Sequence, residues 1–203
     1  MSEKTLSYPD NREPVAFTQE ELGWLPWLEP MPVDQLTERH WAGLVDPSRA
    51  KSPYFLLLAR DPDVLQARTR TDKDIFYNTS DGLPRAEREL AATATSRLNG
   101  CIFCASVHSR FATQYSKRGT DIQRLLDEGV DADLDSRWNA IITASVSLTA
   151  TPVGFGEAHI QELRTAGLDD LEIVDVINGA AFFNWANRLM LSLGEPTPPT
   201  KVS

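Results

Sequence analysis

Cysteine and histidine are scarce in this chain, and so is positive charge. Only 2 cysteines and 3 histidines occur among the 203 residues. Two cysteines are too few to form a disulfide scaffold. The net charge of −9 argues against a nucleic-acid-binding protein and against binding to anionic membranes, because both need an excess of basic side chains. We therefore expect neither nucleic acid nor a membrane as a partner.

Long apolar runs are absent as well. Segments such as 55–59 are far shorter than the roughly 20 residues that cross a bilayer. The opening residues, Met-Ser-Glu-Lys-Thr-Leu-Ser-Tyr-Pro, lack the apolar segment of a signal peptide. These absences predict a cytoplasmic protein whose thiols are kept reduced. In that compartment a Cys-x-x-Cys pair is more often catalytic or metal-binding than structural.

The remaining composition is typical of a globular protein, with 41% hydrophobic and 24% charged residues. No segment shows the alternating pattern of a strand, so the sequence predicts an all-α fold. We divide it into an N-terminal arm with short helices (1–52), a helical domain (53–194) and a disordered tail (195–203).

Start and stop signals delimit the predicted helices. Thr18-Gln-Glu-Glu21 resembles a capping box and predicts a short helix. Asp61-Pro62 begins a helix, and Asn99-Gly100 ends another. Further helices are predicted over residues 33–44, 84–98, 101–117, 121–128, 135–148, 151–167 and 169–193. The last is apolar on most faces, so we expect it in the core or against another subunit.

A faint internal repeat supports this helical pattern. Shifting the chain by 51 residues aligns Leu83 with Leu134, Leu90 with Ile141 and His108 with His159. Both copies read as a helix, a break and a second helix. Only the first copy has cysteines, so a duplicated scaffold would have kept its chemistry in that copy.

Both cysteines stand in one short motif, Cys101-Ile-Phe-Cys104-Ala-Ser-Val-His108. Since a helix turns roughly 100° per residue, Cys101, Cys104 and His108 share one face within about 60°. Cys101 is at the helix N-terminus, where free N–H groups favour a thiolate. His108 lies one turn beyond Cys104, close enough to exchange a proton with it. The motif therefore predicts thiol redox chemistry.

Glu89 is the expected fourth member of this site. Gly100 lets the chain turn, so the helix with Glu89 can pack beside the helix with His108 and orient the imidazole. Glu87 is the alternative carboxylate, but it points about 200° away around the helix. From spacing alone, Glu89 could equally be a solvated residue paired with Arg85 or Arg88.

The spacing Glu89-x11-Cys101-x-x-Cys104-x3-His108 resembles the signature of the alkylhydroperoxidase D-like (AhpD-like) branch of the carboxymuconolactone decarboxylase-like superfamily. The flanking segments Leu-Pro-Arg-Ala-Glu-Arg-Glu-Leu and Asn-Gly-Cys-Ile-Phe-Cys-Ala-Ser-Val-His resemble it too. The segment Phe-Asn-Trp-Ala-Asn-Arg-Leu-Met-Leu-Ser-Leu-Gly is similar to that of its uncharacterised peroxidase-related members. The resemblance covers residues 53–194.

The resemblance implies an AhpD-like helical fold that assembles into trimers or hexamers. It also implies a peroxidase that reduces an alkyl hydroperoxide, is reduced again by an external dithiol or thiol protein, and needs no cofactor. By position, Cys104 is the attacking thiol and Cys101 the proton donor and resolving thiol, while Glu89 and His108 form the proton relay. The best-studied branch has a second histidine immediately before the latter cysteine, where this chain has Phe103.

The mechanism that follows from these roles has three steps. His108, backed by Glu89, deprotonates Cys104, and the thiolate attacks the terminal peroxide oxygen. Cys101 then condenses with the sulfenic acid to give a disulfide. An external dithiol reduces that disulfide by exchange.

Several alternatives stay open from the sequence. The cysteines could be buried and inert, or Cys101, Cys104, His108 and Glu89 could bind zinc. The chain could also be a disulfide oxidoreductase without significant peroxidase activity, a decarboxylase- or lactonase-type enzyme, or a non-enzymatic redox-responsive helical assembly. Residues expected outside the chemistry are His40 and His159, at the surface or structural, and Phe182, Phe183 and Trp185, in the core or an interface.

Overall fold

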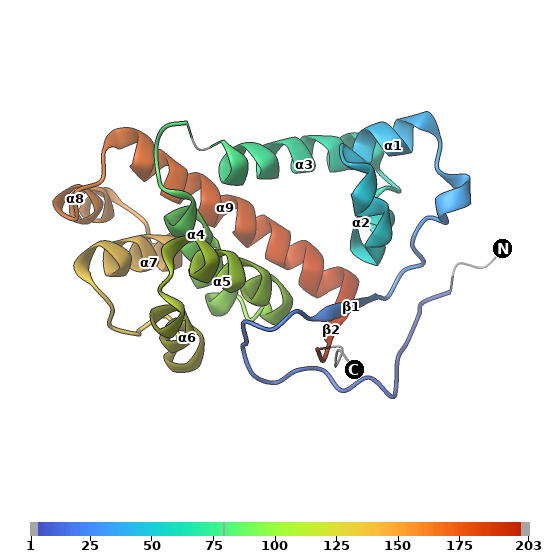
Figure 1. Cartoon of the computed structure of the whole chain (residues 1–203), viewed down its shortest axis with the longest axis horizontal. Coiled ribbons are helices and arrows are strands. Elements are labelled where there is room, and N and C mark those ends of the chain that lie inside the picture. Colours follow the sequence, from blue (N-terminus) through green and yellow to red (C-terminus); the bar gives the residue numbers. More distant parts are fainter. Residues whose placement is uncertain (1–3, 79, 200–203) are drawn as a thin grey trace.

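The computed structural model describes residues 4–78 and 80–199, and these fold almost entirely into helices (Figure 1). The α-helices are α1 (Glu38–Leu44), α2 (Pro53–Leu58), α3 (Pro62–Tyr77), α4 (Arg85–Leu98), α5 (Ile102–Ser116), α6 (Gly119–Glu128), α7 (Ser136–Thr149), α8 (Glu157–Thr165) and α9 (Asp170–Leu193). Two short 3₁₀ turns, η1 (Val33–Gln35) and η2 (Pro47–Lys51), flank α1. The predicted all-α fold is confirmed.

Helix α4 is the centre of the bundle and packs against α5, α7 and α9. It can approach its neighbours closely because its buried positions include Ala91, Ala92 and Ala94. Gly179 of α9 faces Ala91, and a β-carbon added there would lie 3.7 Å from the Ala91 side chain. The main apolar core therefore forms around α4, α7 and α9.

A second apolar cluster lies where α2, α3 and α5 meet the C-terminal half of α9. It contains both cysteines together with aromatic side chains from distant parts of the chain, among them Trp24, Phe76 and Phe183. Figure 1 shows α1, α2 and α3 at the end of α9 that lies away from α6 and α8. The N-terminal elements thus cover the helix turn that carries the cysteines.

Local capping signals predicted the starts of three helices correctly. The Asp61 carboxylate accepts a hydrogen bond from the Val64 N–H at the start of α3. Asp135 does the same for the first residues of α7. Asp169 and Glu172 form a capping box at α9, with distances of 2.8 and 2.9 Å.

The internal repeat has a structural counterpart. The bounds of α7 are those of α4 shifted by 51 residues, and each is followed by a break and a second helix, α5 or α8. Leu90 and Ile141, which the shift aligns, are both buried in the main core. The second copy has Ala140 where the first has Glu89, so its helix pair carries no equivalent acid.

Two predicted helix starts were wrong. Residues 18–21 do not form a helix, because Gln19 instead bonds to Gly119 and Gln123 and lies across the start of α6. Helix α8 begins at Glu157 rather than near Pro152, since the intervening chain turns back and the Gly154 N–H donates to the Ser147 carbonyl at 2.9 Å.

The helix predicted over residues 33–44 is interrupted. Thr37 is extended and is the N-cap of α1, and its N–H lies 3.0 Å from His40 Nδ1. His40 therefore has a structural capping role. His159 is placed in the same way, 3.1 Å from the N–H of Gly156 at the start of α8.

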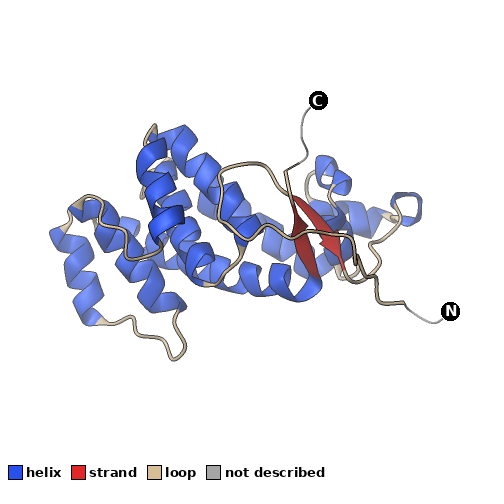
Figure 2. Ribbon diagram, turned by 90° about the horizontal axis from the view of Figure 1, so that it is seen from below, coloured by secondary structure: helices blue, strands red, loops and turns tan. Residues whose placement is uncertain are grey.

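A small antiparallel sheet joins the two ends of the chain, where no strand was predicted. Strand β1 (Gly23–Pro26) pairs with β2 (Gly194–Thr197), as Figure 2 shows. Residues 195–197 are therefore not part of a disordered tail. The rest of that predicted tail, from residue 200 on, lies outside the described residues. The Trp27 indole N–H also bonds to Glu195 at 3.0 Å and fixes this pairing.

The domain boundary between residues 52 and 53 stays a prediction.

No helix within residues 4–78 and 80–199 is long and apolar enough to cross a membrane.

Candidate active site

The two cysteines sit at the turn between α4 and α5. Asn99 ends α4, and Gly100 has a φ of +75°, a conformation that glycine adopts without steric cost. Cys101 is then the N-cap of α5, and Cys104 lies in its first turn. Both thiols are free and nearly enclosed, with 1% of Cys101 and 5% of Cys104 exposed.

The environment pushes the pKa values of the two thiols in opposite directions. The hydrogen bond from Cys104 lowers the pKa of Cys101 below its ordinary value, and the Cys104 backbone amide acts in the same direction. The same interaction raises the pKa of Cys104 well above its ordinary value, and burial adds to this effect. Of the two thiols, Cys101 is therefore the more acidic.

Asn187 of α9 lies beside this pair and was not recognised in the sequence. Its side chain is fully buried and lowers the pKa of both cysteines by hydrogen bonding. Its own position is fixed by Ser96 at 3.0 Å and Asn99 at 3.1 Å. A buried amide in an otherwise apolar helix was the signal that could have identified it, because such groups need partners.

Glu89 and His108 meet as predicted. Glu89 Oε2 lies 2.5 Å from His108 Nδ1, and the carboxyl group is completely buried. An ionised carboxylate can only accept hydrogen bonds, so Nδ1 donates and the other ring nitrogen, Nε2, is on the side away from Glu89. The His108 ring is held between Phe76 and Phe183, with centroids 5.3 and 3.9 Å away.

Arg85 also bonds to Glu89 and explains how a carboxylate can be buried here. Its Nε donates to Glu89 Oε1 at 2.6 Å, and its guanidinium also bonds to the Phe76 carbonyl. Both readings of Glu89 are thus partly right, because it pairs with Arg85 and also orients His108. The order Arg85–Glu89–His108 satisfies both carboxylate oxygens, as buried charges require.

Glu87 takes no part in the Arg85–Glu89–His108 contacts. It bonds to Arg137 of α7 at 2.8 and 2.9 Å, and Arg137 also contacts Glu172 at 2.8 Å. Glu87 therefore links α4 to α7 and α9, away from the cysteines.

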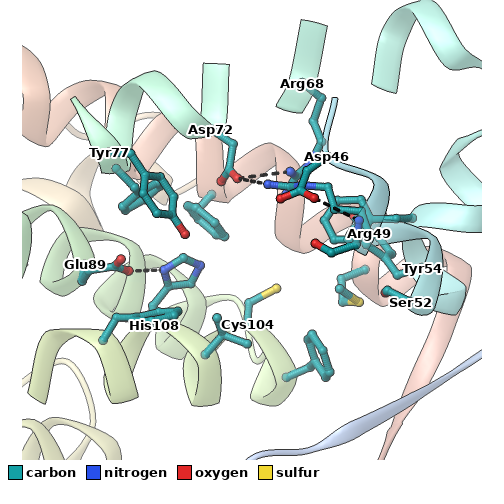
Figure 3. A pocket seen from close by; sticks show the side chains of 18 of the residues that line it. Asp46, Arg49, Ser52, Tyr54, Arg68, Asp72, Tyr77, Glu89, Cys104 and His108 are labelled. Atoms are coloured by element: carbon teal, nitrogen blue, oxygen red, sulfur yellow. Dashed lines mark hydrogen bonds and ion pairs between the residues drawn. The ribbon is translucent and has the colours of Figure 1, made fainter. Parts of the chain in front are cut away.

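A cavity of about 410 Å³ opens in front of Cys104, His108 and Glu89. Figure 3 shows Glu89 and His108 on one side, Cys104 between, and Arg68, Asp72 and Arg49 on the opposite side. Phe103, the residue in place of the relay histidine, also lines this cavity. Its volume is within the range of small-molecule sites.

Cys101 faces a different space. It lines a small recess of about 70 Å³ together with Trp24 of β1 and Pro196 of β2. The two sulfurs of one pair thus face two separate spaces, the larger one in front of Cys104.

The aromatic residues of α9 are divided between core and surface. Phe182 and Phe183 are buried, as expected, whereas Trp185 is exposed in the single chain. Among residues 4–78 and 80–199, no group of three or more histidine, cysteine, aspartate or glutamate side chains is arranged to hold a metal ion.

Comparison with known proteins identifies a matching family profile and a shared fold. The profile of the carboxymuconolactone decarboxylase family matches residues 62–144, a segment that contains Glu89, Cys101, Cys104 and His108. No curated protein matches the sequence.

Solved structures share the fold over nearly the whole chain. One is the alkylhydroperoxidase AhpD core of an uncharacterised peroxidase-related protein from Ralstonia eutropha JMP134, with 23% identity over 96% of this chain and 95% of that chain and a TM-score of 0.70. Another is an uncharacterised peroxidase-related protein from Silicibacter sp. TM1040, with 24% identity over 94% and 96% of the two chains and a TM-score of 0.67.

The debrominase Bmp8 is also similar, with 16% identity over 81% of this chain and 88% of that chain and a TM-score of 0.65. The chain therefore has the all-α fold of the AhpD core. The chain thus resembles alkylhydroperoxidase D-like and carboxymuconolactone decarboxylase-like proteins in fold and, over residues 62–144, in sequence.

Proposed function

We propose that this protein is a thiol-dependent peroxidase that reduces an organic hydroperoxide. The observation that supports this most directly is the position of Cys104, which opens onto the cavity beside His108 while Cys101 stands behind it. A buried thiol pair next to a proton relay suits the reduction of a small oxidant that can enter the cavity. The peroxidase-related neighbours agree with this proposal at the level of the fold.

The first step is the attack of Cys104 on the terminal oxygen of the peroxide. As its sulfur attacks, the Cys104 proton passes to the Cys101 thiolate, the O–O bond breaks and the S–O bond forms. The departing alkoxide takes a proton from His108, which Glu89 orients. The products of this step are an alcohol and a sulfenic acid on Cys104.

The second step joins the two sulfurs. The Cys101 thiol attacks the sulfenic sulfur, and the S–O bond breaks. Its oxygen leaves as water with the Cys101 proton. Two electrons have then passed from the thiol pair to the peroxide. An external dithiol restores both thiols by exchange and is itself oxidised to a disulfide.

Intact mass spectrometry tests this sequence. The reduced protein, treated with one equivalent of an alkyl hydroperoxide, should lose the mass of two hydrogen atoms as its disulfide forms. Cys101→Ser should instead gain one oxygen, trapped at Cys104 by a sulfenic-acid reagent, and Cys104→Ser should do neither. Unchanged mass in the wild type over many minutes would overturn the proposal.

A second candidate function is that of a disulfide oxidoreductase without peroxidase activity. The lowered pKa of Cys101 favours it, because disulfide exchange begins with a thiolate. The burial of Cys101 behind β1 and β2 disfavours it, since a protein disulfide cannot reach the sulfur there. In this alternative, Cys104→Ser would still form a mixed disulfide between Cys101 and a disulfide substrate. Treatment of the wild type with hydroperoxide would leave both of its thiols reduced.

A further inference from the structure

Arg68 is a buried cation with hydrogen-bond donors that are not used. It projects from α3, is only 8% exposed and lines the cavity in front of Cys104. Its Nε and Nη1 atoms are buried and have no hydrogen-bond partner among the described residues. Unpaired N–H groups on a buried guanidinium are costly, so such groups normally have a partner.

The neighbouring charges do not neutralise it. Arg68 Nη1 and Arg49 Nη2 both lie 3.5 Å from the same oxygen of Asp72, at ion-pair distance. One carboxylate therefore faces two guanidinium groups.

The other carboxylates that line the cavity are engaged elsewhere. Glu89 is bonded to Arg85 and His108, and the exposed Asp46 accepts the Ser48 N–H at the rim. Asp46 offsets part of the charge of Arg49, but among the described residues no carboxylate on this side pairs with Arg68 alone.

Aromatic side chains form much of the wall between the two sides. Phe55 lies beneath both cations, with its ring centroid 4.4 Å from the Arg49 guanidinium and 5.4 Å from that of Arg68. Phe76, Phe103 and Phe183 line the space toward Cys104. The cavity thus has a thiol with a proton relay on one side, aromatic walls, and an unsatisfied cation on the other (Figure 3).

We propose that Arg68, assisted by Arg49, binds a carboxylate of the substrate. The preferred substrate is then an organic hydroperoxide with an apolar body and a carboxylate at the end away from the peroxide group. This inference rests on the proposed peroxidase function for the reacting group. The carboxylate site itself depends only on Arg68, Arg49 and the cavity.

The test compares ω-carboxyalkyl hydroperoxides of increasing chain length, each beside its methyl ester. A charge-assisted hydrogen bond to a buried guanidinium should give the best acid an advantage in kcat/KM of about tenfold to a hundredfold over its ester. Arg68→Met should remove that advantage, so that the acid and its ester are turned over at similar rates, even if both rates fall because Arg68 also lowers the pKa of Cys104. Arg70→Met is the matched control, because Arg70 is exposed on the same helix.

The outcomes separate the two proposals. If no acid is preferred over its ester, or if Arg68→Met keeps the preference while its thermal unfolding is unchanged, the carboxylate site is wrong. If no peroxide is turned over, calorimetric titration with the corresponding hydroxy acids and their esters still decides the site. Binding of the acid that is lost in Arg68→Met would then support it, and equal binding of acid and ester would overturn it.

Discussion

Glu89→Gln separates the chemistry of the site from its packing. The substitution keeps the size of a fully buried side chain and removes only its charge. An amide can accept from Arg85 or His108, but it cannot satisfy both as the carboxylate does at 2.6 and 2.5 Å. His108 would then lose the partner that fixes which ring nitrogen carries the proton.

The expected effect on rate is large. Positioned proton transfer contributes about 10²- to 10⁴-fold in enzymes, and in the proposed mechanism His108 supplies it when the alkoxide is protonated. We expect kcat/KM for hydroperoxide to fall by about a hundredfold or more. The free energy of unfolding should fall by roughly 1–3 kcal/mol, because Arg85 keeps its bond to the Phe76 carbonyl.

Glu87→Gln is the matched control on the same helix. Glu87 is also buried and also pairs with an arginine, but its partner Arg137 keeps Glu172 at 2.8 Å. We expect a comparable or smaller loss of stability and no change in rate. The assay is the rate of disulfide formation after addition of an alkyl hydroperoxide, followed by intact mass with both cysteines in place. Unfolding in urea is measured on the same samples.

Equal rates for Glu89→Gln and the unmodified protein would refute the proton-relay argument. Equal losses in Glu89→Gln and Glu87→Gln would refute it too, because the effect would then follow stability rather than position.

Three further predictions concern the fold and its assembly. Burial raises the pKa of Tyr54 from 10.0 to about 12, so the folded state holds the phenol proton more tightly than the unfolded state does. The resulting stabilisation of the folded state is complete below about pH 10 and is lost as the pH rises through 12. At about 1.4 kcal/mol per unit this amounts to roughly 3 kcal/mol, and Tyr54→Phe should lack that alkaline slope in urea unfolding. Leu90→Ala should cost about 2–5 kcal/mol of unfolding free energy, since Leu90 is fully buried beside α7 and α9, and a smaller loss would contradict the described core. Light scattering should show a trimer or hexamer in solution, and a monomeric mass would contradict that expectation.

The sequence predicted the parts of the site that depend on local signals. Asn99-Gly100 marked the helix turn, and the spacing of Glu89, Cys101, Cys104 and His108 placed their side chains together. These predictions succeeded because two adjacent helices joined by a tight turn have few ways to pack.

Residues that reach the site from distant elements were not predictable in this way. Asn187 comes from α9 and Arg68 from α3. The amide of Asn187 in an apolar helix indicates that it needs a partner, but the local sequence of neither residue shows which groups it faces. The strands β1 and β2 were missed because each has only four residues and contains proline, so their pairing depends on tertiary contact. The helix predicted at Thr18-Gln-Glu-Glu21 was wrong because the tertiary contacts of Gln19 outweigh the local capping signal.

The pairing of β1 with β2 also sets an order in time. Among the described residues, β1 precedes every helix and β2 follows them all, so Trp24 has no strand partner until β2 has been synthesised. The recess at Cys101, bounded by Trp24 and Pro196, is likewise completed only then. A nascent chain that has not yet reached β2 therefore lacks one wall of this recess, and its Cys101 is less enclosed than in the folded protein.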